Sequence, residues 1–263
     1  MCGRYALTAM PEEVAESMAL AFLEAFPPRY NIAPTQPMLI VTAAERPEPG
    51  SNQPTRRPLL VRWGFLPAWA EDPKEFPLLI NARAETAHDK SSFRAALRHR
   101  RVLIPASGFY EWHRPPKESG ARPQAYWIRP KQGGIVSFAG LMETWASAEG
   151  SELDTAAVLT TGANATLSPI HSRMPVVIAP EDRDRWLDCK TQEPREVMDL
   201  MRPAPDDLFE AIPVSDRVNK VANSHPSLQD PIAPGASAIP AVKAALEKGA
   251  ANKAAAGDQL SLF

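Results

Sequence analysis

Apolar residues along the chain fall mainly into short runs, and proline, glycine or polar residues bound each run. Short runs rich in branched and aromatic residues are typical of buried β-strands. The pattern predicts strands over residues 2–8, 38–42, 59–65, 78–83, 101–112 (strand, turn, strand), 125–129, 135–145, 156–161, 174–180 and 209–215.

Helices are predicted to be fewer and shorter. Pro11 suits the first turn of a helix that would run to about residue 25, before Pro27 and Pro28. Further short helices are expected over residues 93–100 and 181–189. No alternation of strands and helices runs through the chain, so we expect an α+β fold. The expected fold is a single β-rich domain of mostly antiparallel sheet, barrel-like, with flanking short helices, over residues 1–230.

Composition adds two constraints. The chain has 28 prolines among 263 residues, about twice the usual share, which favours turns and loops over long helices. The net charge of −2 means that any nucleic-acid surface must be a local basic patch. There is no apolar run of the roughly 18–20 residues needed to cross a bilayer, no secretory signal, and only two cysteines. We therefore expect a cytoplasmic protein that does not bind membranes.

Cys2 is the first candidate for chemistry. Removal of Met1 would leave a cysteine with a free α-amine, which is partly neutral and nucleophilic at physiological pH. Such an amine can condense with an aldehyde to an imine, and the neighbouring thiol can then close a thiazolidine ring. The alternative is that Cys2 is a small, inert residue at the start of a strand.

Glu111 and His171 are further candidates. Glu111 lies in an aromatic stretch, GFYEW, where burial would raise its pKa and suit it to acid–base catalysis. The alternative is a carboxylate at a strand edge facing water. His171 precedes a strand and titrates near neutrality, although a lone histidine is more often structural.

A nucleic-acid surface is suggested by arginines near these candidates. Arg4, Arg83 and Arg173 lie within two residues of Cys2, Asn81 and His171, and guanidinium groups match phosphate oxygens. Trp63 and Phe93 could offer stacking faces for unpaired bases. The ordinary alternative places the arginines on a solvated face and the aromatic residues in the core. No phosphate-binding loop, dinucleotide motif or zinc-ligand spacing is present, so no cofactor and no metal are expected.

Taken together, nine segments of the chain resemble the SOS response-associated peptidase (SRAP) family, whose members are also called abasic-site processing proteins. They are MCGRY (1–5), RYNIAPTQ (29–36), RWGFLPAW (62–69), INARAET (80–86), SFR (92–94), RVLIPASGFYEW (101–112), FAGLMETW (138–145), TTGANATLSPIHSRMPVVI (160–178) and NKVANSHPS (219–227). The resemblance is in order along the chain. The departures are the sequence of residues 45–58 and His225, where relatives commonly have an acid.

The resemblance implies a fold with a groove for single-stranded DNA and a covalent adduct with abasic sites. It makes Cys2 the nucleophile, exposed by autocatalytic loss of Met1. Glu111 would deprotonate the amine and help reverse the adduct, His171 would donate a proton to the opening sugar, and Asn81 would hold nucleophile and sugar. The DNA contacts it implies are Arg4, Asn31, Trp63, Arg83, Phe93, Arg173 and Met174. A nucleoid-associated role in the DNA damage response would follow.

The last five residues, Gln259, Leu260, Ser261, Leu262 and Phe263, resemble peptides that dock on the DNA-polymerase sliding clamp. They follow an Ala-, Gly-, Pro- and Lys-rich segment, residues 231–263, that we expect to be flexible. The alternative is that these apolar residues fold back onto the domain.

Two other functions remain open from the sequence. A cysteine peptidase or amidase with an N-terminal nucleophile would use Cys2, Glu111 and His171 against an amide instead of an aldehyde. A module that binds single-stranded DNA without chemistry would not need Cys2 at all.

Overall fold

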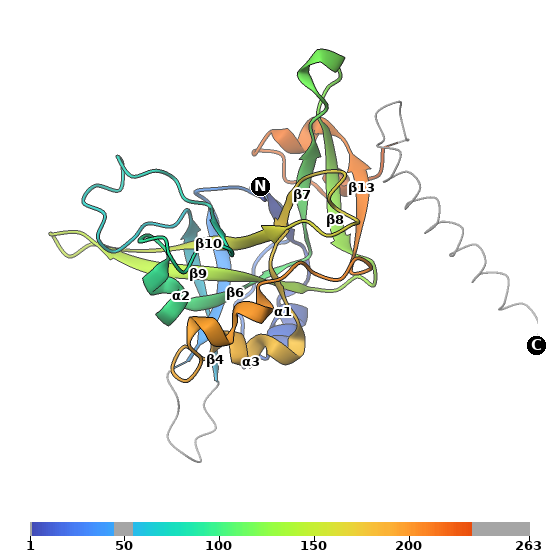
Figure 1. The fold of residues 1–263 in the computed structure, drawn as a ribbon. Coiled ribbons are helices and arrows are strands. Elements are labelled where there is room, and N and C mark those ends of the chain that lie inside the picture. Colours follow the sequence, from blue (N-terminus) through green and yellow to red (C-terminus); the bar gives the residue numbers. More distant parts are fainter. Residues whose placement is uncertain (1, 45–54, 233–263) are drawn as a thin grey trace, which may run out of the picture.

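The computed structural model describes residues 2–44 and 55–232. β-Strands dominate this part of the chain (Figure 1). The strands are β1 (Tyr5–Leu7), β2 (Arg29–Ile32), β3 (Pro37–Ala43), β4 (Arg56–Trp63), β5 (Asn81–Arg83), β6 (Arg101–Ala106), β7 (Gly108–His113), β8 (Gln124–Pro130), β9 (Val136–Ala146), β10 (Glu152–Gly162), β11 (Arg173–Pro175), β12 (Val177–Ile178) and β13 (Phe209–Val214). The α-helices are α1 (Pro11–Met18), α2 (Arg94–His99) and α3 (Arg183–Leu187). The 3₁₀ turns are Lys117–Ser119, Pro180–Asp182, Pro194–Glu196, Met198–Leu200, Asp216–Asn219 and Pro226–Gln229.

The strands form two sheets. One has the order β13-β8-β7-β1-β2, and all of its pairings are antiparallel. The other follows the order β11-β10-β4-β3-β6-β9-β12, with β5 beside β10. Only the pairings of β10 with β4 and with β5 are parallel. The expectation of an α+β fold built on mostly antiparallel sheet is confirmed.

The second sheet is partly ring-like. β10 also pairs with β9, so β10, β4, β3, β6 and β9 form a closed circuit of neighbours. Two of its contacts are short: Arg62 and Trp63 of β4 pair with β10, and Val41 of β3 pairs with Leu103 of β6. The first sheet remains open. The barrel-like expectation therefore holds for this circuit and does not extend to a true barrel.

Helix α1 is shorter than the sequence pattern predicts. It ends at Met18 because Ala19 takes a left-handed conformation (φ 51°), and Leu20 N–H then donates to Ala15 O at 2.9 Å. The chain continues without helix to Arg29. The proline pair that we expected to stop the helix thus lies nine residues beyond its actual end. No helix within residues 2–44 and 55–232 is long and apolar enough to cross a membrane.

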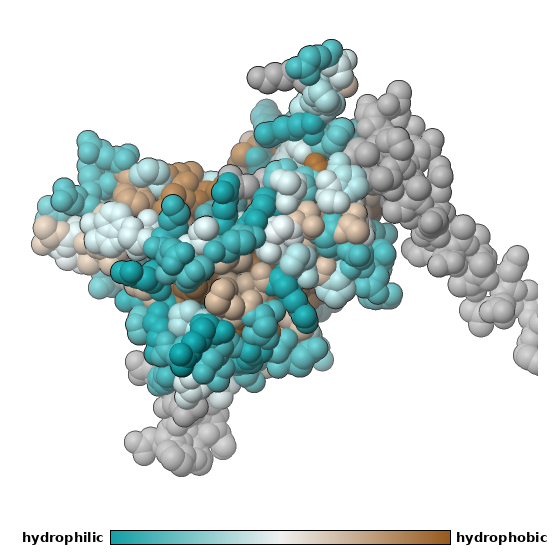
Figure 2. Space-filling view, in the orientation of Figure 1, coloured by the Kyte–Doolittle hydropathy of each residue, from teal (hydrophilic) through white to brown (hydrophobic). Residues whose placement is uncertain are grey.

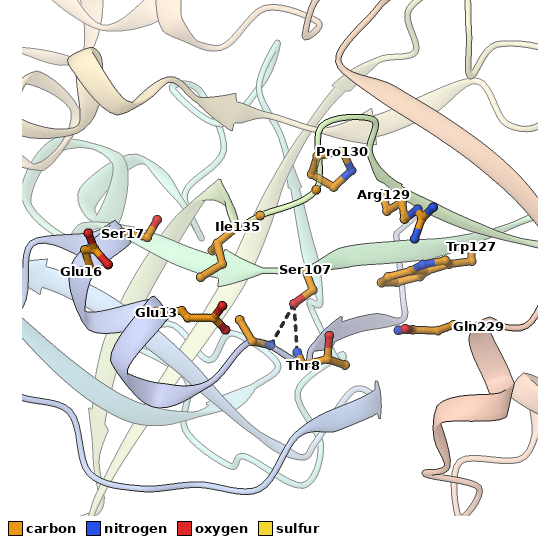
Figure 3. A pocket seen from close by; sticks show the side chains of 13 residues that line it. Thr8, Glu13, Glu16, Ser17, Ser107, Trp127, Arg129, Pro130, Ile135 and Gln229 are labelled. Carbon is orange, nitrogen blue, oxygen red and sulfur yellow. Dashed lines mark hydrogen bonds between the residues drawn. The ribbon is translucent and has the colours of Figure 1, made fainter. Parts of the chain in front are cut away.

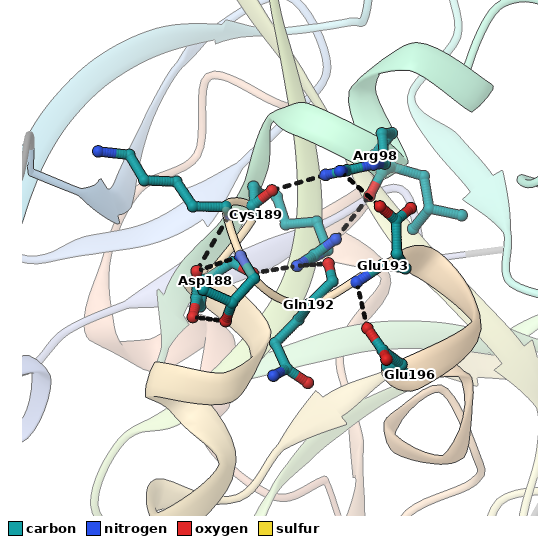
Figure 4. Close-up of polar contacts among 10 residues, drawn as sticks. Arg98, Asp188, Cys189, Gln192, Glu193 and Glu196 are labelled. Carbon is teal, nitrogen blue, oxygen red and sulfur yellow. Dashed lines mark hydrogen bonds and ion pairs between the residues drawn. The ribbon is translucent and has the colours of Figure 1, made fainter.

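Arg101 organises the segment after α3. Its guanidinium, on a side chain only 1% exposed, donates to four backbone oxygens: Trp186 O at 2.6 Å, Leu97 O at 2.9 Å, Asp188 O at 2.9 Å and Gln192 O at 3.0 Å. Arg98, on α2, reaches the same segment through Cys189 O and Glu193 Oε1, each at 2.6 Å (Figure 4). These contacts fasten residues 186–193 to β6 and α2.

The described chain ends beside β13. Pro231 forms an isolated bridge with Val214, and Ile232 N–H donates to Pro213 O at 3.0 Å. The expected flexible tail from residue 233 onward and the clamp peptide at 259–263 lie outside the described residues. The division of the chain near residue 230 stays a prediction.

Candidate functional site

Cys2 lies at the meeting point of the two sheets. It precedes β1, whose pairing with β7 is continued by a hydrogen bond from Tyr110 N–H to Arg4 O at 2.9 Å. Cys2 is 1% exposed, and its Sγ lies 4.0 Å from Arg4 O. The burial agrees with the alternative of an inert cysteine, so the polar groups around Cys2 must decide between the two interpretations.

Asn81 provides the first of these groups. It begins β5 in the other sheet, and its Nδ2 donates to Cys2 O at 3.0 Å. Its Oδ1 is buried and accepts no hydrogen bond from the described residues. A backbone carbonyl near the start of the chain is therefore fixed by a side chain 79 residues away, which orients Cys2 relative to β5.

Glu111 and His171 are the other polar groups near Cys2. The β1–β7 register places Glu111 on the strand next to Gly3, and the carboxylate is buried, at 3% exposure. His171 lies in the turn between β10 and β11, and its Nδ1 is 4.0 Å from Glu111 Oε1. Arg173 N–H donates to His171 Nδ1 at 3.0 Å. Arg173 O also lies 3.2 Å from His171 Nδ1, so this ring nitrogen contacts both backbone polar groups of Arg173.

Burial changes the pKa of both the Glu111 carboxyl and the Cys2 thiol. It raises the pKa of the Glu111 carboxyl above its usual range, against the smaller opposing effect of nearby positive charge, including His171. Burial also raises the pKa of the Cys2 thiol, and the Glu111 carboxylate adds to that increase. The thiol is therefore mostly protonated at neutral pH, and its raised pKa makes the Glu111 carboxylate a better proton acceptor than an exposed carboxylate.

A cavity of about 450 Å³ opens beside this cluster. Its walls include Gly3, Arg4, Glu111, Trp112, Arg114, Pro123, His171 and Asn219. Cys2 itself does not line it, although Gly3 does. The residues predicted from distant parts of the sequence thus converge: Asn81 contacts Cys2, while Glu111 and His171 face the same cavity.

The family model described as "SOS response associated peptidase (SRAP)" matches residues 1–221. The chain belongs to the SRAP family. Among similar proteins, this SRAP chain is 37% identical over 231 residues to "Abasic site processing protein YoqW" of Bacillus subtilis, a match that covers 87% of the chain and 98% of that protein. It is 30% identical over 240 residues to "Abasic site processing protein YedK" of Escherichia coli, covering 88% of the chain and 100% of that protein.

Solved structures agree on the fold. A Bacteroides thetaiotaomicron protein superposes with a TM-score of 0.72 at 22% identity, covering 88% of the SRAP chain and 100% of that protein. A Bordetella bronchiseptica protein gives a TM-score of 0.66 at 25% identity, covering 81% and 100%. The predicted family is confirmed by the family model and the relatives, and the fold class is shared with these structures.

The predicted phosphate-binding arginines differ in how far they are already engaged. Arg173 makes a bidentate ion pair with Glu85, at 2.7 and 2.9 Å, and also donates to Thr160 O. Arg4 donates to Asn31 Oδ1 at 2.8 Å and to Val218 O at 2.7 Å. Arg83 is exposed and donates no hydrogen bond within the described part of the chain. Of these arginines, Arg83 is the one whose guanidinium is available without breaking an existing hydrogen bond.

Asn31 also has a structural task. It is 5% exposed, and its Nδ2 donates to Val218 O at 3.3 Å, Lys220 O at 3.2 Å and Asn223 O at 2.8 Å. Asn219, within the same segment, accepts a hydrogen bond from Trp112 Nε1 at 2.8 Å and lines the cavity. Asn31 therefore holds the wall of the cavity in this conformation.

Three predicted DNA contacts have side chains that lie in the core. Trp63 is fully buried, edge-on to Tyr5, with Nε1 donating to Ile80 O at 2.9 Å. Met174 is also fully buried, and Phe93 is 8% exposed against Phe65. Side chains packed in this way offer no face to a base in this conformation, so the core alternative holds for them.

Sequence reasoning missed a more accessible indole. Trp69 follows β4 and is 58% exposed, and Leu78 is 48% exposed. Figure 2 shows hydrophobic side chains gathered over the loops that follow β4. The signal was in the motif RWGFLPAW, since Trp63 lies on a strand whereas Trp69 follows Pro67 in a loop.

Another cavity, of about 650 Å³, lies elsewhere and contains none of the predicted site residues. It lies between α1 and the β8–β9 turn, with Glu13, Glu16, Ser107 and Trp127 in its walls (Figure 3). Ser107 Oγ there accepts hydrogen bonds from Thr8 N–H and Ala9 N–H, a structural role. Among the described residues, no group of three or more His, Cys, Asp and Glu side chains could hold a metal ion.

Proposed function

We propose that this SRAP chain processes abasic sites in single-stranded DNA, by forming a covalent adduct between Cys2 and the aldehyde of the lesion. The observation that carries the proposal is the hydrogen bond from Asn81 to Cys2 O, with the buried Glu111 carboxylate and His171 beside it. Relatives that match nearly along their whole length are named abasic site processing proteins, which supports the same function.

The chemistry requires a free α-amine on Cys2, hence hydrolysis of the Met1–Cys2 peptide bond. The amine nitrogen attacks the aldehyde carbon of the ring-opened deoxyribose to give a carbinolamine, and loss of one water gives an imine. The Cys2 sulfur then adds to the imine carbon while the nitrogen gains the thiol proton. The product is a thiazolidine, and the net reaction releases one water.

The surroundings of Cys2 suggest an order for these steps. Because burial raises the pKa of the thiol, little thiolate is present at neutral pH, so the amine attacks first. Glu111, with its own raised pKa, accepts the proton that the amine loses. His171 donates a proton as the sugar ring opens, and Asn81 keeps the Cys2 backbone oriented. We assign the DNA contacts to Arg83 first, with Arg4 and Arg173 at the same face.

We further propose that the chain removes its own Met1, in line with the word peptidase in the family name. Intact-mass measurement of protein from cells would test this with Glu111→Ala and His171→Ala variants. Retention of Met1 in the Glu111→Ala protein supports self-processing. Complete loss of Met1 in both variants would assign the cleavage to a separate aminopeptidase.

The central test is a denaturing gel after mixing the protein with a single-stranded oligonucleotide that carries one abasic site. We expect a shifted band that is lost with Cys2→Ser and kept with Cys189→Ser, the matched control at the chain's other cysteine. Absence of the band from wild-type protein lacking Met1 would refute the proposal. Turnover of a peptide in trans would instead favour the amidase, and tight DNA binding without an adduct would favour a binding module.

A further inference from the structure

An apolar groove lies away from the Cys2 site. Its cavity, of about 620 Å³, runs between the segment that follows α1 and the β3–β4 pair. Its apolar walls include Phe22, Leu23, Phe26, Leu39, Leu59 and Leu60. Phe22 is 71% exposed and Leu60 is 70% exposed, the two highest values among the exposed large hydrophobic residues of the described chain. Apolar side chains gathered in this way usually mark a surface that another segment covers.

The rim of the groove carries an excess of positive charge. Arg29 and Arg57 line it together with one acid, Glu24. Arg29 is engaged with Pro37 O and Gln36 Oε1, whereas Arg57 is exposed and its guanidinium donates no hydrogen bond to the described residues. A suitable occupant therefore combines large apolar side chains with a neighbouring acid.

We infer that residues 258–263 of this chain, Asp258-Gln259-Leu260-Ser261-Leu262-Phe263, occupy the groove. Phe263 is the only aromatic residue among residues 1, 45–54 and 233–263, and Leu260 and Leu262 lie directly before it. Asp258 supplies the acid for Arg57. Residues 45–54, which adjoin β3 and β4, contain no large apolar side chain that could fill the cavity.

The connection is long enough for this contact. The described chain ends beside β13, and the groove adjoins β2, at the opposite edge of the same sheet. Four strand spacings of about 4.8 Å separate these edges, or about 19 Å. Residues 233–257 can span up to about 80 Å when extended. Since tethering gives an effective concentration on the order of millimolar, even a weak contact would be populated.

Photo-crosslinking of the full chain tests the inference. Phe263→benzoylphenylalanine places a photoreactive ring at the proposed plug, and peptide mass spectrometry then locates the linked residues after irradiation. We expect links within the same chain to residues 20–29 or 57–61. Leu60→Asp should lower their yield about tenfold, the loss expected when one leucine-sized contact is removed. Met198→Asp, at another exposed apolar residue (44%) outside the groove, is the matched control and should leave the yield unchanged.

Four results would overturn the inference. They are links confined to other surfaces, a groove link that survives Leu60→Asp, crosslinked dimers that increase with protein concentration, and a link that forms only to an added sliding clamp. The readout does not involve DNA or Cys2, so its failure would leave the proposed reaction untouched.

Discussion

Glu111 and Arg101 are both buried charged residues, yet their surroundings differ sharply. The Arg101 guanidinium donates to four backbone oxygens at 2.6–3.0 Å and lies 5.6 Å from the centre of the Trp186 ring. The Glu111 carboxylate has His171 Nδ1 4.0 Å from its Oε1 and faces a cavity. Burial raises the pKa of the Glu111 carboxyl, whereas four hydrogen bonds hold the Arg101 guanidinium, so the two residues should affect stability differently.

The difference separates a structural charge from one suited to chemistry. The Arg101 guanidinium is held in a single geometry, and its proton cannot leave at physiological pH. The Glu111 carboxylate is buried enough to raise its pKa and borders a cavity, so it can gain and lose a proton as a reaction proceeds. Variants at each residue should therefore affect different measurements.

Glu111→Gln should give the largest effect, and this effect should be on the rate of adduct formation and not on stability. Removing a general base costs about 10²–10⁴-fold, so we expect the rate of adduct formation with abasic DNA to fall within that range. The thermal unfolding midpoint should not fall, because an amide replaces a carboxylate whose burial opposes folding. Single-turnover gels and thermal melts measure the two quantities. If Glu111→Gln were destabilised and formed the adduct at an unchanged rate, Glu111 would be a structural charge like Arg101.

Arg101→Met should show the opposite behaviour. It leaves four buried carbonyl oxygens without their donor, and we expect a loss of about 3–5 kcal/mol in the free energy of unfolding. Urea unfolding followed by tryptophan fluorescence measures it, with Arg98→Met as control. Arg98 reaches the same segment but is 28% exposed, so its removal should cost about 1 kcal/mol or less. Equal losses in the two variants would contradict the role assigned to Arg101.

Local patterns predicted the strands better than they predicted the helices. The run from Arg101 to Trp112 was expected to form strand, turn and strand, as β6 and β7 do. The helix from Pro11 was expected to reach residue 25, but the left-handed Ala19 ends it at Met18. Nothing in the sequence around Ala19 marks that conformation, because glycine or asparagine is the usual signal. The parallel β4–β10 pairing in the ring joins segments far apart in the sequence, so local patterns did not predict it.

The candidate site was also predicted only in part from the sequence. Cys2, Asn81, Glu111 and His171 could be named because whole segments resemble a family, and their positions in the fold are compatible with one site. Residue type alone could not tell which aromatic residues and arginines face solvent. Trp63 and Trp69 are both tryptophans of one motif, yet the first is buried by the β4–β10 pairing and the second is exposed. Likewise, the Glu85 partner of Arg173 lies 88 residues away.

A smaller effect, on DNA binding, should distinguish the guanidinium of Arg83, which donates no hydrogen bond to the described residues, from that of Arg173, which is already held by an ion pair. Arg83→Gln should weaken binding to undamaged single-stranded DNA by several-fold and lower the salt dependence by about 0.7, the slope for one phosphate contact. Arg173 already pairs with Glu85, so Arg173→Gln should change that slope less. Fluorescence anisotropy at several salt concentrations compares them. A larger slope change for Arg173→Gln would mean that the Glu85 pair opens when DNA binds.

The smallest expected effect is on the pH dependence of stability, which tests whether Glu111 titrates with a raised pKa in the folded protein. The folded-state pKa of Glu111 is raised by burial, so between its ordinary value and the raised one the folded state binds more protons than the unfolded state. The contribution of Glu111 to stability is therefore fully present below the ordinary pKa and is lost as pH rises through the folded-state value. Relative to wild type, Glu111→Gln should gain stability across that window and level off above it. Met198→Leu, at an exposed residue that carries no titratable group, should show no such trend. Urea unfolding of both variants from pH 4 upward measures the difference. If the stability of Glu111→Gln relative to wild type did not change with pH, the Glu111 carboxyl would not have the raised folded-state pKa that distinguishes it from Arg101.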